Sequence, residues 1–192
     1  MTNEMVEKKE IYDLAEEGDW RKNIQLVKDT VTTGLSADEF KFFVYIAKMY
    51  NLNPLKREIY AIKYGDKPAQ TIVGRDGYYQ LAKTTPGYNG YETIDHIEYD
   101  ASGKAKDSSW ATCTVWIKDI EHPIVEKAYL GEYNKGYNAL WKTMPITMIR
   151  KVAESRAFRR AAGAFGTYSE EEMSNSIPSI GQSVIDKIGK KV

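Results

Sequence analysis

The spacing of apolar residues is helical in the first quarter of the chain. Between residues 20 and 32, apolar side chains recur every three or four positions, which predicts an amphipathic helix. Ser36-Ala-Asp-Glu39 is a capping box, and the segment after it ends at Leu52-Asn53-Pro54. The pattern therefore predicts a second helix that starts at the capping box and buries Phe40, Phe43, Val44 and Ala47.

The period then changes to two, as in β-strands. Residues 57–63 and 69–73, joined by a turn at 65–68, predict a β-hairpin. A short helix is expected over residues 78–83, ended by Pro86-Gly87. Three further alternating runs, at 88–99, 110–118 and 124–130, are separated by short turns. They predict a small antiparallel meander.

The last third returns to a helical period. A loop rich in Gly, Asn and Tyr precedes Trp141, and Pro145 lies in the first turn of a long helix that runs to about Gly163. A second capping box is expected at residues 169–172. The fold class is α+β, with helices flanking a β-hairpin and a small antiparallel meander. We expect an acidic N-terminal arm over residues 1–19, a core domain over 20–173 and a short C-terminal tail over 174–192.

Charge is unevenly distributed, although the net charge is zero. Residues 1–19 hold two lysines and seven acids, whereas residues 134–160 hold seven basic residues and Glu154 as the one acid. A uniformly basic protein would repel its own copies. The acidic arm facing a neighbour's basic block would instead favour assembly, so neutrality does not argue against a nucleic-acid partner.

Composition limits the cellular context. Hydrophobic residues make up 42% and charged residues 28%, as in globular proteins. The one cysteine, Cys113, excludes an internal disulfide, and neither an apolar leader nor a long apolar run is present. We expect a soluble intracellular protein with no membrane partner.

The sequence gives little support for an enzyme activity. The sequence has no phosphate-binding Gly-rich loop and no serine-nucleophile elbow, although two histidines do not exclude a triad. His96, Cys113 and His122 lack zinc-ligand spacing. A carboxylate cluster is the remaining option, in a magnesium-dependent nuclease, and its candidates are Asp76, Glu92, Asp95 and Glu98. We expect no enzyme activity, no metal and no cofactor.

The basic block has a composition suited to single-stranded nucleic acid. Arg156, Arg159 and Arg160 fall within an arc of about 100° on the predicted long helix, with Glu154 as the only acid expected in reach. Tyr133, Lys135, Tyr137, Trp141 and Lys142 lead into this helix, and Arg75 with Tyr78 and Tyr79 forms a second patch. Cations along phosphates and rings under bases are the usual means of binding a single strand. A solvated helix face, with its arginines paired to acids elsewhere, is the alternative.

Four blocks in order resemble the Bet/RecT family of phage single-strand annealing proteins, most closely its Redβ-like branch. They are Leu52–Lys63, Val73–Tyr78, Trp141–Ala153 and Phe165–Tyr168, within a similarity from about Ser36 to Met173. The resemblance implies a Redβ/RecT-like annealing core that pairs complementary DNA strands without ATP. It also implies a homo-oligomer in rings or helical filaments. The protein would be encoded by a phage or prophage and act in the cytoplasm of a bacterial host.

The resemblance also implies partners and contacts. The partners are single-stranded DNA, the annealed duplex intermediate, and a phage exonuclease or host single-strand binding protein. Family members commonly have a longer C-terminal region for docking, so docking would either be absent here or fall to the short amphipathic segment Ile180–Ile188 in the tail. Position by position, the resemblance carries over Arg75, Trp141, Lys142, Arg150, Lys151 and Arg159, with Lys56 and Lys63 beside the first strand. The predicted DNA-binding set adds Lys135, Arg156 and Arg160 from the basic block. A passive single-strand-binding module remains an alternative.

Overall fold

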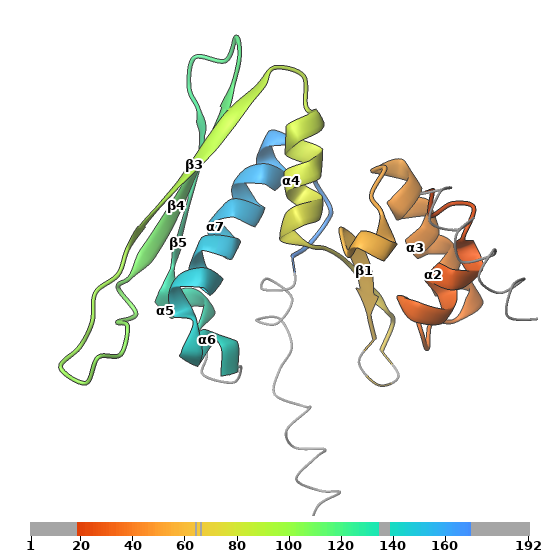
Figure 1. Cartoon of the computed structure of the whole chain (residues 1–192), viewed down its shortest axis with the longest axis horizontal. Helices are drawn as coiled ribbons and strands as arrows, with labels where there is room; N and C mark the ends of the chain where they lie inside the picture. Colours follow the sequence, from red (N-terminus) through yellow and green to blue (C-terminus); the bar gives the residue numbers. More distant parts are fainter. Residues whose placement is uncertain (1–18, 64, 66, 135–138, 170–192) are drawn as a thin grey trace, which may run out of the picture. The chain divides into compact units, whose positions relative to one another are not determined.

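A computed structural model describes residues 19–63, 65, 67–134 and 139–169 (Figure 1). The arm up to residue 18, Lys135, the second capping box beyond Ser169 and the tail over 174–192 lie outside these described residues. The chain separates into two compact units, Met1–Ile72 and Val73–Val192, called unit 1 and unit 2. The predicted regions, with one core over 20–173, stay a prediction. No helix in the described part combines the length and apolar character needed to span a membrane.

Unit 1 contains the two helices and the hairpin that the sequence predicts. Its elements are α2 (Ile24–Thr30), α3 (Ala37–Met49), the 3₁₀ turn η1 (Pro54–Lys56), β1 (Ile59–Ile62) and β2 (Gln70–Val73), whose last residue begins unit 2. The capping box is confirmed, since the Glu39 N–H donates to Ser36 Oγ and the Ser36 N–H donates to Glu39 Oε2. Phe43 and Ala47 are buried. Phe40 and Val44 are only half-buried, because the core lies on the side of α3 that carries Phe43 and Ala47.

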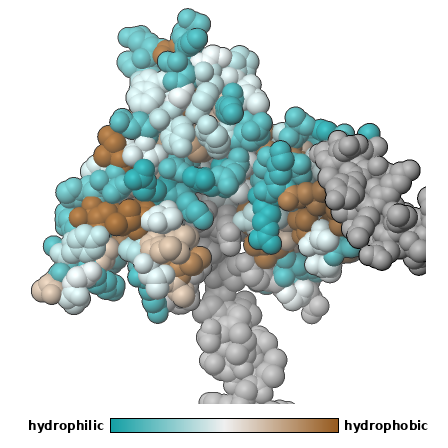
Figure 2. Space-filling view, viewed as in Figure 1, coloured by the Kyte–Doolittle hydropathy of each residue, from teal (hydrophilic) through white to brown (hydrophobic). Residues whose placement is uncertain are grey.

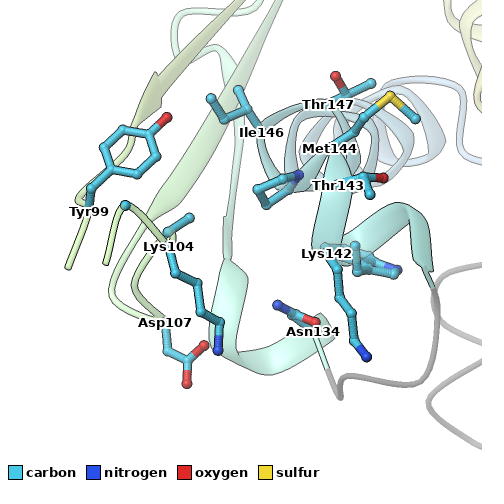
Figure 3. A pocket seen from close by; sticks show the side chains of 13 residues that line it. Tyr99, Lys104, Asp107, Asn134, Lys142, Thr143, Met144, Ile146 and Thr147 are labelled. Atoms are coloured by element: carbon cyan, nitrogen blue, oxygen red, sulfur yellow. The ribbon is translucent and has the colours of Figure 1, made fainter. Parts of the chain in front are cut away.

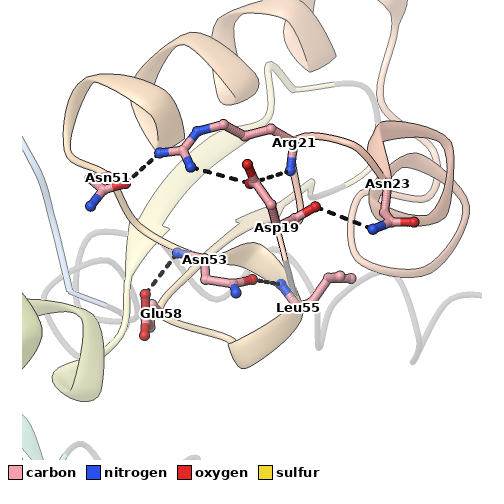
Figure 4. Close-up of polar contacts among 7 residues, drawn as sticks. All are labelled: Asp19, Arg21, Asn23, Asn51, Asn53, Leu55 and Glu58. Carbon is pink, nitrogen blue, oxygen red and sulfur yellow. Dashed lines mark hydrogen bonds and ion pairs between the residues drawn. The ribbon is translucent and has the colours of Figure 1, made fainter. Parts of the chain in front are cut away.

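The turn between α3 and β1 is closed by polar side chains (Figure 4). The Asn53 N–H donates to Glu58 Oε2 at 2.7 Å, and Asn53 Oδ1 accepts from the Leu55 N–H at 2.9 Å. The Arg21 guanidinium donates to the side-chain oxygens of Asn51 and Asp19. This motif, which contributes to the family resemblance, therefore has a structural role: it sets where β1 begins.

Unit 2 is a three-stranded antiparallel sheet with helices on one face (Figure 1). Its strands, β3 (Tyr88–His96), β4 (Trp110–Ile117) and β5 (Ile124–Tyr129), pair in the order β3-β4-β5, so the predicted meander is confirmed. The helices are α4 (Arg75–Thr84), α5 (Leu130–Tyr133), α6 (Ala139–Thr143) and α7 (Pro145–Ala161). Pro145 occupies the first turn of α7, as predicted. α4 begins earlier than predicted because the extended backbone of Gly74 forms its N-cap.

Small side chains let α7 lie close to the sheet. Ala111, Cys113 and Val115 of β4 and Ala128 of β5 are fully buried. On α7, the buried residues facing this surface include Ile149, Val152, Ala153 and Ala157. At the far end of α7, Phe158 packs against Tyr79 of α4 and Tyr91 of β3, with ring centroids 5.3 and 4.9 Å apart. The aromatic cluster thus joins α7 to α4 and to the sheet.

The opposite face of this sheet is exposed in the described chain. Ile94, Trp116, Val125 and Tyr129 lie on it and are 38–54% exposed. Lys127 Nζ sits 4.1 Å from the centroid of the Trp110 ring. Hydrophobic groups also interrupt the polar surface elsewhere on both units (Figure 2). The helices that carry the predicted DNA contacts therefore cover only one side of the sheet.

Candidate nucleic-acid interface

Most of the predicted arginines on α7 are paired with carboxylates of the sheet. Arg150 Nη1 lies 2.7 Å from Asp95 Oδ1 on β3. Arg156 Nη2 lies 2.8 Å from Glu126 Oε2 on β5, and Arg160 binds the other oxygen of the same carboxylate. Glu126 is 7% exposed. A buried carboxylate between two guanidinium groups ties α7 to β5.

Arg75 is held in a second network, between α4 and α7. Its Nη1 lies 3.0 Å from Glu154 Oε2, and it also pairs with the neighbouring Asp76. Glu154 is buried and accepts a further hydrogen bond from Thr93 Oγ1 at 3.0 Å. Partial burial alone would lower the pKa of Arg75, but the two carboxylates outweigh it and the pKa is raised. Arg75 is therefore charged and anchored.

Arg159 has a different partner, because its Nη1 donates to the Thr167 carbonyl at 3.2 Å. The hydroxyl of Thr167 in turn accepts from Tyr78 Oη at 2.9 Å. Arg159 thus fixes the turn that follows α7 onto α4. Its predicted role as a DNA contact stays a prediction.

The expectation that Glu154 is the only acid in reach of the basic block is wrong. Glu126 and Asp95, on two different strands, also reach α7. The alternation of β5 contains a signal for Glu126, since it shares strand parity with Ala128 and so points inward. The arginines hold α7 against the sheet, and a phosphate could engage those paired with acids only by competing with these carboxylates.

Three of the predicted lysines differ from most of the arginines. Lys142 on α6, Lys151 on α7 and Lys56 in η1 make no ion pair or side-chain hydrogen bond with any residue that the structure describes. Lys142 and Lys56 are exposed, and Lys151 is half-buried. Lys56 lies in unit 1 and the other two lie in unit 2. A phosphate that binds these three groups would displace no partner among the residues that the structure describes.

Trp141 is almost fully buried, with 5% of its surface exposed, and it lines one side of a pocket. Its ring is nearly parallel to that of Tyr133, with an interplanar angle of 10° and centroids 6.2 Å apart. A base could reach only the part of the indole that faces the adjoining pocket. The predicted contact between Trp141 and DNA stays a prediction.

A pocket of about 830 Å³ brings Trp141 and Lys142 next to the start of α7 (Figure 3). Its other walls are the β3–β4 loop, with Tyr99, Lys104 and Asp107, and Asn134 after α5. The N-terminus of α7 also lines it, and no side chain caps this helix. Two ammonium groups and two aromatic rings around one cavity suit a nucleotide segment, which presents phosphate and base together.

Lys63 has a structural partner in unit 1. Its Nζ lies 2.9 Å from Glu39 Oε2, while Glu39 Oε1 accepts from the Ala69 N–H at 2.9 Å. One carboxylate thus joins the N-terminus of α3 to the end of β1 and the start of β2. The Ser36 N–H, Lys63 and the Ala69 N–H together lower the pKa of Glu39 to about 2.

We expect Glu39→Gln to remove part of the acid sensitivity of unit 1. The folded-state pKa lies below the unfolded value of about 4.3, so this carboxylate stabilises the fold above pH 5. The contribution is lost as the pH falls towards 2. Urea unfolding at pH 7 and pH 3 should show a smaller loss of stability for Glu39→Gln than for the wild type. Asp38→Asn, which changes a 93% exposed neighbour, is the control and should keep the wild-type difference.

The carboxylates and thiol proposed for metal chemistry do not come together. The described residues contain no group of three His, Cys, Asp or Glu side chains able to hold a metal ion. Asp95 pairs with Arg150, whereas Glu98 accepts from Ser108 Oγ. Cys113 is buried on the inner face of the sheet, and burial raises its pKa to about 11. His96 instead stacks on Trp110, which alternates with the buried positions of β4.

Comparison with known proteins gives one family. The sequence model described as the RecT family matches residues 17–185. The recombination protein bet of Escherichia phage lambda is 25% identical over 159 residues, covering 78% of this chain and 57% of that protein. An uncharacterized protein, UU154, of Ureaplasma parvum serovar 3 is 30% identical over 117 residues, covering 60% of this chain and 50% of that protein. The chain spans about half the length of these curated relatives.

Proposed function

The chain belongs to the RecT family, and from this membership we propose that it binds single-stranded DNA and anneals complementary strands in phage-type recombination. The match over residues 17–185 is the observation that carries the proposal, because it includes both units of the fold. A relative covering most of this chain is named as a recombination protein.

The site geometry supports sequence-independent binding. The pocket combines aromatic rings with lysines that make no ion pair within the described part of the chain, and such groups can bind any strand through its phosphates and base faces. A strand held by its backbone leaves its base edges free to test a second strand. Sequence information then comes from base pairing, and duplex stacking stabilises the product.

Assembly would extend this small site along the DNA. One pocket can hold only a short segment, so affinity for a long strand would come from many subunits acting together. We propose a homo-oligomer, with the acidic arm over residues 1–19 as one assembly contact. A phage exonuclease or host single-strand binding protein would be the further partner. No nucleotide cofactor is needed, because base pairing itself drives annealing.

An annealing assay tests this proposal. Two complementary oligonucleotides carrying a fluorescence donor and acceptor are mixed with the protein in the absence of ATP, once with magnesium and once with EDTA. We expect annealing several times faster than in the protein-free control under both conditions. The rate should fall steeply with salt, because phosphate contacts release counterions.

Other results would contradict the proposal in distinct ways. Binding of the oligonucleotides with annealing no faster than the control would indicate a passive single-strand-binding module. Cleavage that requires magnesium would indicate a nuclease. If the protein did not bind the oligonucleotides at low salt, every function based on binding single strands would be excluded.

A further inference from the structure

We infer that the β3–β4 loop forms the second wall of the strand-binding pocket, with Lys104 binding a DNA phosphate and Tyr99 stacking on the adjacent base. The inference rests on the proposed function and names contacts that neither the sequence pattern nor the family resemblance indicates. In the sequence, residues 100–103 read only as a turn.

Lys104 and Lys142 approach the same pocket from different elements, the β3–β4 loop and α6. Figure 3 shows their side chains running in the same direction, with the Asn134 amide between them. Neither ammonium makes an ion pair or hydrogen bond within the described part of the chain. Two such cations on opposite walls of one pocket suit consecutive phosphates of one strand.

Tyr99 supplies a ring at the same wall. The residue is 54% exposed, although its backbone forms a bridge to Ala105. An exposed ring held by a fixed backbone can stack on a base at little cost in conformational entropy. Trp141 is the opposing aromatic wall. The one acid among the described lining residues, Asp107, leaves a positive balance with the two lysines.

The loop is ordered by its own hydrogen bonds. Asp100 Oδ1 accepts from the N–H groups of Ser102 and Lys104, at 2.8 and 3.0 Å. The Asp100 N–H donates to the Lys104 carbonyl at 2.9 Å, which closes the turn from the other side. Lys104 is therefore presented from a defined backbone position, which lowers the entropy cost of binding a phosphate.

The loop is also fixed against α5. The Gly131 N–H donates to the Asp107 carbonyl at 3.1 Å, and the Leu130 N–H donates to the Ser109 carbonyl at 2.8 Å. The contact is so close that a Cβ at position 131 would lie 2.8 Å from Asp107 Cβ. Gly131 thus allows the loop to approach α5 and form the pocket wall.

Charge-removing variants test the lysine contact. Single-strand affinity is measured as a function of salt for the wild type and for Lys104→Gln, Lys142→Gln and Lys106→Gln. Lys106 is the matched control, because it lies two residues from Lys104 but pairs with Glu98 and does not line the pocket. We expect Lys104→Gln and Lys142→Gln each to weaken binding about tenfold at low salt and to lower the salt slope by about 0.7. Lys106→Gln should bind like the wild type.

Tyr99→Ala tests the stacking contact, with Tyr168→Ala as control because both tyrosines are 54% exposed in unit 2. We expect Tyr99→Ala to weaken binding about fivefold or more without changing the salt slope, and Tyr168→Ala to have little effect. Gly131→Ala, which displaces the loop, should lower affinity in the same way as Tyr99→Ala and Lys104→Gln together.

The outcomes separate the two proposals. Wild-type protein that does not bind single strands would overturn the proposed function. Wild-type binding that is weakened by Lys142→Gln, but not by Lys104→Gln or Tyr99→Ala, would overturn the loop contact alone. Circular dichroism and thermal melting of each variant establish that the fold is intact.

Discussion

Phe158→Ala is expected to lower the free energy of unfolding of unit 2 by about 3–5 kcal/mol. Phe158 is 1% exposed and packs against Tyr79 and Tyr91, so truncation leaves a cavity where three elements meet. The edge-to-face contact with Tyr91 adds to the loss, since such pairs contribute about 0.5–1.5 kcal/mol beyond area burial. Urea unfolding followed by circular dichroism measures the change.

Phe165→Ala is the matched control, because this residue is of the same type in the same unit but is 75% exposed. It should change the free energy of unfolding by less than about 1 kcal/mol. Equal effects of the two substitutions, or a loss below about 1 kcal/mol for Phe158→Ala, would show that the aromatic cluster does not hold α7 in place.

Local signals in the sequence predicted much of this fold. Ser36 and Glu39 fix the start of α3, and Pro145 fixes the start of α7, because caps and first-turn prolines act within a few residues. The alternating run over residues 110–118 predicted β4, and the structure shows that Ala111, Cys113 and Val115 form its inner face. Where the signal is local, the prediction agrees with the structure to within a few residues.

The partners of the arginines could not be predicted in the same way. Arg150 pairs with Asp95, which lies 55 positions earlier in the sequence. Arg156 pairs with Glu126, which lies on a different strand from Asp95. Strand parity indicates that Glu126 points inward, but which helical residue it meets depends on how α7 crosses the sheet. That crossing is set by tertiary packing, which the helical period alone does not determine.

The candidate site shows the same limit. Trp141 and Lys142 were identified from their own neighbourhood in the sequence, whereas Tyr99 and Lys104 lie about 40 residues earlier. The β3–β4 loop lies beside Trp141 and Lys142 because it is hydrogen-bonded to α5 at Gly131 and Leu130. A pocket assembled from a loop and two helices becomes visible only once the chain is folded.

The pairing of the arginines makes the lysines the sharper test of DNA binding. Removing Arg156 or Arg160 leaves Glu126 buried without one of its partners, so folding and binding would change together. Lys142 and Lys151 make no such contact among the described residues, so glutamine in their place removes charge without breaking an ion pair. A weaker affinity of these glutamine variants for DNA can therefore be interpreted as the loss of a phosphate contact.

We therefore expect the double variant Lys142→Gln, Lys151→Gln to bind single-stranded DNA about a hundredfold more weakly at low salt, with an unchanged melting temperature. Each charge-assisted contact contributes about 1.5 kcal/mol, or roughly tenfold, and two lost contacts should lower the salt slope by about 1.4. Fluorescence anisotropy with a labelled oligonucleotide at several salt concentrations measures both quantities.

The double variant Lys83→Gln, Lys106→Gln removes the same charge from unit 2 outside the pocket, and it should stay within about twofold of the wild type. This comparison separates local contact from overall charge, because both variants have the same net charge. If the two double variants weakened binding equally, long-range attraction would account for it and neither lysine would contact DNA. If neither changed the affinity, the phosphate contacts would have to come from other cations, such as Lys104, or from arginines that leave their carboxylates when DNA arrives.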